Sequence, residues 1–214
     1  QKHPDMSADI TLRKGLTSPI SGTADLNISS ADSAYNFVIY PHDFHGVVPK
    51  MLLREGEAVL QGQPIFYSKA NPEIKFVSPV SGTLTKIERG AKRRIMSLSI
   101  ASDGKNKAVT HSLEKLDKLE AADVKKHLLE SGCWPFVKQR PYDVIADPDS
   151  TPKAIFISGF STAPLAADVP FILSSQKEDF QNGINALAKL TPKVHLSVDA
   201  LSLIHISEPT RHTQ

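Results

Sequence analysis

Residues 73–90, EIKFVSPVSGTLTKIERG, decide how the first half of this chain folds. An apolar, strand-like run enters the pentapeptide SPVSG at residues 78–82, and a second strand-like run follows at once. Pro79 fixes its own φ angle and Gly82 can supply a positive φ angle, so the pentapeptide predicts a tight corner between two strands. No histidine or acidic residue lies at a recognised motif spacing from Ser81, and serine is common in turns. We therefore interpret the corner as structural.

The same kind of corner occurs earlier in the chain, because SPISG occupies residues 18–22. Around both copies, residues 10–103 consist of short apolar runs separated by glycine and proline. Two of these runs, 83–87 and 96–100, alternate apolar and polar residues, which is typical of β-strands. Residues 10–103 are therefore predicted to form an all-β domain that closes as a sandwich or barrel.

Charged, helix-like sequence follows this domain. Residues 113–130 predict a helix that Gly132 ends. Residues 153–200 predict a strand, a loop, a helix ending near Leu190 and a second strand, and SQKE at residues 175–178 matches a capping box for that helix. The pattern favours a partial, Rossmann-like open α/β sheet. The predicted fold class is therefore α+β and multidomain.

The composition argues against several classes of protein. The formal charge of the 214 residues is only +2, which is too small to indicate nucleic-acid binding. The basic cluster of Arg89, Lys92, Arg93 and Arg94 is expected to be a solvated strand end. The single cysteine, Cys133, excludes an internal disulfide and favours a reducing compartment. No window reaches the roughly 18 apolar residues of a membrane helix, so membrane association is expected to go through a partner.

Both ends of the sequence are interpreted as partly foreign. A connecting region is expected between the two domains. Met6 is taken as the natural start, which places residues 1–5 upstream of it. Residues 1–9 as a whole are expected to lie upstream of the fold or to be disordered. Residues 201–214, LSLIHISEPTRHTQ, resemble translated adapter sequence and are expected to be a non-native tail. Residues 104–152 are expected to be a helical linker and docking strap between the domains.

The predicted β domain resembles the barrel-sandwich hybrid of biotinyl and lipoyl domains. Gly56 and Gly62 lie six residues apart before a predicted hairpin, and the SPVSG corner leads into the returning strand. In that family a modified lysine occupies the hairpin tip, and Lys69 superficially matches it. A two-residue extension after Ala70 displaces Lys69 from a tight turn, so the resemblance implies a structural module. A lipoyl or biotin carrier modified at Lys69 or Lys75 stays an alternative.

A longer series of ordered matches resembles the N-terminal part of the A subunit of the Na+-translocating NADH:quinone oxidoreductase. The matching segments are RKGL at 13–16 with SPISG, then residues 46–51, 73–82, 87–93, 128–134, 140–141, 154–157 and 163–167. The family's protein is considerably longer, so the resemblance implies that the second domain is truncated here.

The resemblance implies a peripheral subunit on the cytoplasmic face of a bacterial inner membrane. The complex of that family oxidises NADH, reduces ubiquinone and exports sodium, with FMN, FAD, riboflavin and iron–sulfur centres in the partner subunits. The implied partners are the other subunits, above all the adjacent multi-span membrane subunit, with ubiquinone as a candidate ligand. The chain is expected to be an enzyme subunit without catalytic residues of its own.

Flavin binding by this chain is not expected. Related flavin-binding subunits of complex I and of the Rnf complex place a glycine-rich loop where this chain has GCWPFVK at residues 132–138. Backbone amides can approach a phosphate only where no Cβ atoms intervene, and bulky side chains occupy this segment. A flavin-binding electron-transfer subunit related to the Rnf C subunit stays a second alternative.

Two groups of residues are candidates for binding. Gly159, Phe160, Ser161 and Thr162 follow a predicted strand at its carboxyl end, where open α/β sheets bind ligands, although a plain turn is the simpler interpretation. The uncharged loop suits a quinone head group better than a nucleotide. Trp134, Phe136 and Arg140, together with Arg93, are candidates for a partner interface, with core packing as the alternative for the aromatic residues.

Four further residues could suggest a metal or redox site, and each has a simpler interpretation. His42 and His45 flank an acidic residue, but no partner cluster for a metal is visible, so a polar loop is expected. Cys133 lies beside a tryptophan and is expected to be a buried, inert thiol. His195 alternates with apolar neighbours and is expected to point away from their face.

Overall fold

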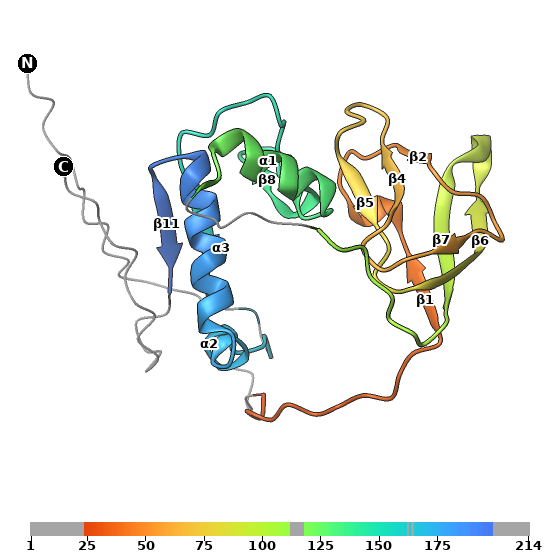
Figure 1. The fold of residues 1–214 in the computed structure, drawn as a ribbon, viewed down its shortest axis with the longest axis horizontal. Coiled ribbons are helices and arrows are strands. Elements are labelled where there is room, and N and C mark those ends of the chain that lie inside the picture. Colours follow the sequence, from red (N-terminus) through yellow and green to blue (C-terminus); the bar gives the residue numbers. More distant parts are fainter. Residues whose placement is uncertain (1–23, 112–117, 162, 164, 199–214) are drawn as a thin grey trace, which may run out of the picture.

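The computed structural model describes residues 24–111, 118–161, 163 and 165–198, and these form a β domain and an α/β domain (Figure 1). The N-terminal SPISG copy, residues 112–117, Thr162 and the expected foreign segments at residues 1–9 and 201–214 lie outside the described residues. In Figure 1 the β domain occupies the right side, and α2, α3 and β11 occupy the left.

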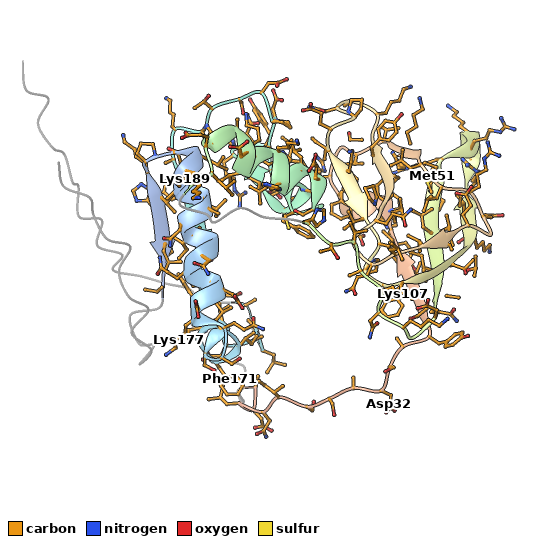
Figure 2. The ribbon with its side chains drawn as sticks, in the orientation of Figure 1. Asp32, Met51, Lys107, Phe171, Lys177 and Lys189 are labelled. Atoms are coloured by element: carbon orange, nitrogen blue, oxygen red, sulfur yellow. The ribbon has the colours of Figure 1, made fainter. Side chains whose placement is uncertain are left out.

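The β domain consists of two sheets that share one apolar core. One sheet has the order β1 (Asn36–Ile39), β7 (Ile95–Ser102), β6 (Gly82–Arg89) and β3 (Ala58–Val59). The other has the order β2 (Pro49–Met51), β4 (Pro64–Ser68) and β5 (Lys75–Val77). All pairings within both sheets are antiparallel. Figure 2 shows the side chains that fill the space between the sheets.

The core explains why the alternating runs became strands. Phe66 of β4 and Phe76 of β5 stack with ring centroids 4.4 Å apart, and Leu84, Leu98 and Ile100 face them from β6 and β7 within the same buried cluster. Inward-pointing apolar residues on both sheets are what a two-layer β structure needs. The predicted barrel-sandwich hybrid is confirmed, and the strands that the structure describes form two sheets, not a closed barrel.

The SPVSG pentapeptide turns the chain from one sheet to the other, as predicted. The Ser78 amide donates to the Gln63 carbonyl at 2.9 Å, and the Ser78 carbonyl accepts from the Gly62 amide at 2.8 Å. The Ser78 hydroxyl donates to the Val80 carbonyl at 2.6 Å. The corner is therefore closed by its own hydroxyl and fixed to the loop before β4.

The predicted role of Gly82 in this corner is wrong. Gly82 has no positive φ angle; instead it begins β6, where an added Cβ atom would lie 1.9 Å from the Ala101 carbonyl oxygen. The glycine is needed because the backbones of β6 and β7 approach too closely for any side chain. Among the glycines quoted for the hybrid resemblance, Gly56 and Gly62 have positive φ angles, at 88° and 79°.

The α/β domain begins with α1 (Ala121–Glu130), which is shorter than predicted. Glu120 and Asp123 form a capping box, in which the side chain of each residue accepts a hydrogen bond from the backbone amide of the other. This box fixes the start of the helix at Ala121. At the other end Gly132 adopts a φ angle of 75°, and the Cys133 amide donates to the Leu128 carbonyl at 3.0 Å. The predicted glycine cap is confirmed.

A short strap and a strand–helix–strand unit complete the described chain. Its elements are the 3₁₀ turn η4 (Trp134–Phe136), the hairpin β8 (Lys138–Gln139) with β9 (Val144–Ile145), then β10 (Ile155–Ser158), α2 (Val169–Leu173), α3 (Lys177–Leu190) and β11 (Val194–Ser197). β10 and β11 pair in parallel, with α3 preceding β11, and α1 packs against α3. The prediction of an α/β unit with a helix ending near Leu190 is confirmed.

The capping box predicted at residues 175–178 is wrong. Gln176 is the N-cap of α3 and makes no side-chain cap, so Glu178 lies one position too early for the reciprocal bond. The reason is the preceding helix: the Ser174 hydroxyl donates back to the Phe171 carbonyl at 2.7 Å, and the Gln176 amide donates to the Leu173 carbonyl at 2.9 Å. The turn that closes α2 therefore makes Gln176 the N-cap of α3, one residue after the Ser175 position that the box requires.

Replacing Gly82 by alanine should destabilise the β domain severely. The new Cβ atom would collide with a backbone carbonyl that cannot move without parting β6 from β7, which costs about 3 kcal/mol. Gly183→Ala is the matched control, because nothing lies within 4 Å of its Cβ position in α3. That variant should gain about 0.5–1 kcal/mol from helix propensity. Urea unfolding of both variants measures the difference, and equal stabilities would contradict the close approach.

Ser81→Ala should raise the pKa of Asp103. The Ser81 hydroxyl donates to Asp103 Oδ1 at 2.6 Å and is the largest cause that lowers the pKa of this carboxyl, followed by the Lys105 amide. Because the folded pKa is depressed, this contribution to stability is complete above the unfolded pKa and is lost as the pH falls through the folded pKa. NMR titration of the carboxyl measures the change.

Ser97→Ala is the control for this titration, because the Ser97 hydroxyl donates to a different carboxylate, Glu88 Oε2, at 2.9 Å. It should leave the Asp103 titration unchanged. An Asp103 pKa that does not respond to Ser81→Ala would show that the hydroxyl does not hold the carboxylate in solution.

Candidate functional site at the domain junction

The two domains are joined where the end of α1 meets β5. Gly132 lies so close to this strand that an added Cβ atom would be 2.6 Å from both γ-carbons of Val77. Two residues later, Trp134 is 4% exposed and belongs to the same core cluster as Phe66 and Leu84 of the β sheets. We refer to Val77, Gly132, Trp134 and the carbonyl of Ala146 as the domain junction.

The local sequence explains how Trp134 reaches the core. The left-handed turn at Gly132 ends α1, and Pro135 is the second residue of the 3₁₀ turn η4, a position that needs no amide donor. The indole Nε1 then donates to the Ala146 carbonyl at 2.8 Å, so the polar atom of a buried side chain is satisfied. The β8–β9 hairpin supplies this acceptor, because the Ala146 amide donates back to the Val137 carbonyl at 2.9 Å.

The expectation of a buried Cys133 is wrong, because its side chain is exposed. The turn at Gly132 directs Trp134 into the core, and the preceding residue faces the solvent as a consequence. Along the strap, Trp134 and Pro135 are both buried, and the next residue, Phe136, is 75% exposed.

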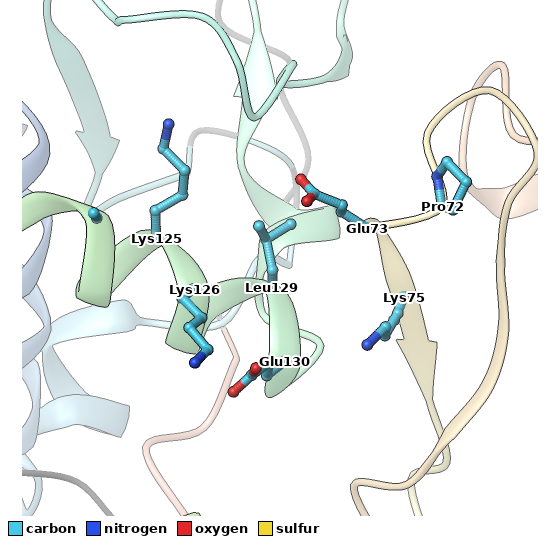
Figure 3. Close-up of a pocket in the computed structure, with 8 residues that line it drawn as sticks. Pro72, Glu73, Lys75, Lys125, Lys126, Leu129 and Glu130 are labelled. Carbon is cyan, nitrogen blue, oxygen red and sulfur yellow. The ribbon is translucent and has the colours of Figure 1, made fainter.

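A hollow of about 570 Å³ opens beside the junction, between α1 and the loop that joins β4 to β5 (Figure 3). It is lined by Pro72, Glu73, Lys75, Ala122, Lys125, Lys126, Leu129 and Glu130. Lys125 is already engaged, because its Nζ donates to the Pro148 carbonyl at 2.5 Å. The lining contains no histidine, cysteine or hydroxyl side chain. This junction hollow presents charges of both signs that a polar surface could contact. Its lining contains no pair of nucleophile and base that is typical of a catalytic site.

Sequence reasoning did not find the junction hollow. A signal was present on α1, where Ala122, Lys126 and Glu130 recur at a spacing of four residues and must share one face of the helix. What faces them could not be inferred, because Glu73 and Lys75 come from a distant hairpin. The same hairpin places Lys69 at the first position of the six-residue loop 69–74, away from its centre.

The predicted ligand loop follows β10 at its carboxyl end, but it lies apart from the junction hollow. The Gly159 amide donates to the Ser197 carbonyl at 2.8 Å, and an added Cβ atom at Gly159 would be 3.0 Å from the same oxygen. The Ser158 hydroxyl donates to the Phe160 carbonyl at 2.9 Å, and the Ser161 hydroxyl accepts from the Ala163 amide at 3.3 Å. Thr162 is outside the described residues. Ligand binding by this loop stays a prediction.

The four predicted interface residues are not brought together. Trp134 is in the core, which agrees with the packing alternative, while Phe136 and Arg140 are exposed on the strap. The Arg140 guanidinium lies 3.7 Å from the Asp143 carboxylate. Arg93 lies between β6 and β7, the strands on the side of the β domain away from α3 (Figure 1). A partner interface at these residues stays a prediction.

The histidines give no metal site within the part of the chain that the structure describes. His42 Nε2 lies 3.7 Å from Asp43 Oδ1 in an exposed 3₁₀ turn, and no group of three His, Cys, Asp or Glu residues is arranged to hold a metal. His195 stacks on Phe156 with ring centroids 4.9 Å apart, on the exposed face of the β10–β11 pair. Its predicted direction is confirmed.

None of the described helices combines the length and the apolar character required to cross a bilayer. The described chain is thus a barrel-sandwich hybrid domain fastened to an α/β domain by a buried tryptophan, with a charged hollow at the seam. These features define a two-domain α+β protein.

Comparison with known proteins identifies the family. Residues 10–103 match the model of the NqrA N-terminal barrel-sandwich hybrid domain, and residues 119–211 match the model of the NqrA second alpha/beta domain. The chain belongs to the NqrA family. Both domain types agree with the architecture described above.

Curated relatives are named as the A subunit of the Na(+)-translocating NADH-quinone reductase. The chain is 38% identical to the protein from Tolumonas auensis over 92% of its own length and 45% of the relative's. It is 37% identical to a Haemophilus influenzae protein over 86% and 41% of the two lengths, and 34% identical to a Pseudomonas aeruginosa protein over 91% and 44%. The chain therefore spans less than half the length of these relatives.

Substitutions at Trp134 should measure the strength of the junction. Trp134→Ala removes the indole from the shared core and should cost about 3–5 kcal/mol, because the cavity closes only in part. Trp134→Phe keeps a ring but leaves the Ala146 carbonyl unpaired, which costs about 1–3 kcal/mol. Tyr142→Ala, at an aromatic residue that is 77% exposed, is the control and should change stability by less than about 0.5 kcal/mol. Chemical unfolding gives the three values, and a neutral Trp134→Ala would contradict the packing.

Proposed function

We propose that this chain is a peripheral, non-catalytic subunit of a sodium-pumping NADH:quinone reductase. In this role it contributes to assembly of a complex that oxidises NADH, reduces ubiquinone and exports Na+. Membership of the NqrA family supports the assignment to such a complex. The non-catalytic role is supported by the domain junction. Residues 132–138, which correspond to the flavin loop of related subunits, here hold the two domains together.

The single observation that carries the proposal is the state of the main chain in residues 132–138. A flavin phosphate needs amides that are free to donate and are not covered by side chains. Here the amides of Cys133, Phe136 and Val137 donate within the chain, to the carbonyls of Leu128, Cys133 and Trp134 at 3.0, 3.2 and 2.9 Å. Pro135 has no amide hydrogen to offer. The FMN, FAD, riboflavin and iron–sulfur centres of the complex then belong to partner subunits.

The partners of the chain are the other subunits, foremost the adjacent multi-span membrane subunit on the cytoplasmic face of the inner membrane. Phe136 is exposed on the strap, and the junction hollow carries charges of both signs, so the chain offers a partner an apolar and a polar contact. Ubiquinone is the candidate ligand of the uncharged loop after β10. Within that loop, Phe160 is partly exposed and could face an aromatic head group.

Purification of the tagged chain from its native host tests the proposal. The chain should copurify with Na+-stimulated NADH:quinone reductase activity and with flavin-containing subunits. The chain purified alone should be colourless and should take up no flavin. Failure to copurify would contradict the subunit role, while stoichiometric flavin on the isolated chain would contradict the non-catalytic role.

A further inference from the structure

The turn between β6 and β7 is an exposed and strongly basic projection. All residues from 88 to 94 are exposed, and we refer to these seven residues as the basic tip. Between residues 86 and 94 the sequence has five basic side chains and one acidic side chain, a formal charge of +4, whereas the whole chain carries only +2. The rest of the chain is therefore net negative, and the positive charge is concentrated at one end of one hairpin (Figures 1 and 2).

The backbone of the basic tip is held by its own hydrogen bonds. The Gly90 amide donates to the Arg94 carbonyl at 2.8 Å, and the Arg93 amide donates to the Gly90 carbonyl at 3.2 Å. Lys92 and Arg93 have φ angles of 55° and 62°, two successive left-handed residues that are not glycine. This conformation is costly for side chains with a Cβ atom. The fold therefore keeps a compact, strained turn at the place where it carries the most charge.

The cations at the basic tip are little neutralised by the protein. Its only acid, Glu88, accepts a hydrogen bond from the Ser97 hydroxyl at 2.9 Å and lies 3.9 Å from the Lys86 ammonium. Lys92, Arg93 and Arg94 take part in no ion pair among the residues that the structure describes. Three neighbouring cations are thus left to interact with something outside the chain.

We propose that the basic tip binds the anionic phospholipid surface of the membrane. The inference rests on the proposed function, which brings the chain next to that membrane. A phospholipid surface suits the tip because it offers dense negative charge and demands no complementary shape. An acidic protein partner is the less favoured occupant, because stable protein interfaces bury about 800 Å² on each side and seven residues at a hairpin end are too few.

Exposed Met96 adds an apolar contact at the base of the basic tip. Its side chain is 39% exposed and lies against Gly90, where an added Cβ atom would be 3.1 Å from its Sδ atom. Basic residues next to an apolar side chain are the combination that surface-bound proteins present to lipid headgroups. The attraction should remain reversible, because a basic patch without a lipid chain or an inserted helix gives only weak anchoring.

Sedimentation with lipid vesicles tests the inference on the intact chain. The vesicles contain either phosphatidylcholine alone or phosphatidylcholine with about a third of phosphatidylglycerol, a fraction chosen to give a strongly anionic surface. The wild-type chain should sediment with the anionic vesicles at low salt and not with the neutral ones. The binding should fall steeply towards 1 M NaCl, where charges are screened beyond about 3 Å.

Two triple variants with the same loss of charge locate the binding. Each cation near an anionic surface contributes about a fivefold gain in partitioning, so Lys92→Gln, Arg93→Gln and Arg94→Gln together should lower it roughly a hundredfold. Lys153→Gln, Lys177→Gln and Lys193→Gln remove three exposed charges from the α/β domain and should lower it far less. Circular dichroism checks that each variant is folded. The salt dependence of vesicle binding is measured on the wild-type chain, so this part of the test holds even if a variant does not fold.

Several outcomes would overturn the inference. These are no binding of the wild-type chain to anionic vesicles, equal binding to neutral ones, or equal losses in the two triple variants. Vesicle binding that survives the triple change at the tip, combined with loss of copurification with the complex, would assign the tip to an acidic protein partner. If vesicle binding fails but copurification with reductase activity is intact, the membrane inference is wrong and the proposed function is not affected.

Discussion

The structure depends on one close contact, the packing of the Gly132 turn and Trp134 against the β domain. Gly132 meets Val77 without room for a side chain, and the indole of Trp134 enters the same apolar cluster as the side chains of both sheets. Burial of a large aromatic side chain with a satisfied polar atom is among the strongest local contributions that a single residue makes. The α/β domain is attached to the β domain through this contact.

The same contact restricts what the strap can do. Residues that end a helix, turn through a left-handed glycine and begin a 3₁₀ turn use their amides for these turns, and a core tryptophan holds them in place. A segment fixed in this way suits a scaffold, whereas a cofactor site needs donors held open for a ligand. Two clusters of charged groups lie away from this strap, in the junction hollow and on the basic tip.

Much of the fold could be predicted from the sequence, because local signals act within a few residues. Alternation indicated the strands, Gly132 indicated the end of α1, and the SPVSG corner was placed correctly between two strands. The errors came where distant segments decide. Gly82 is required by the backbone of Ala101, a residue 19 positions away. The cap expected at Ser175 did not form, because α3 begins after Gln176, one residue later than predicted. A local pattern carries no information about either constraint.

The candidate site was predicted less well for the same reason. Trp134 could be singled out as important, but whether it faced a partner or the core depended on the acceptor at Ala146 and on the Val77 surface. The junction hollow combines one face of α1 with a hairpin about 50 residues earlier, and no motif marks such a pairing. Family resemblance identified the type of protein, whereas only the three-dimensional arrangement shows which atoms are already engaged.

Hydrogen exchange of the strap amides in the intact chain tests the central claim most directly. The amides of Cys133, Phe136 and Val137 should exchange slowly, as donors in fixed turns beside a core residue do, and added FMN should leave their rates unchanged. Fast exchange at these three amides, with protection that appears only when FMN is added, would contradict the account and identify the segment as a flavin site.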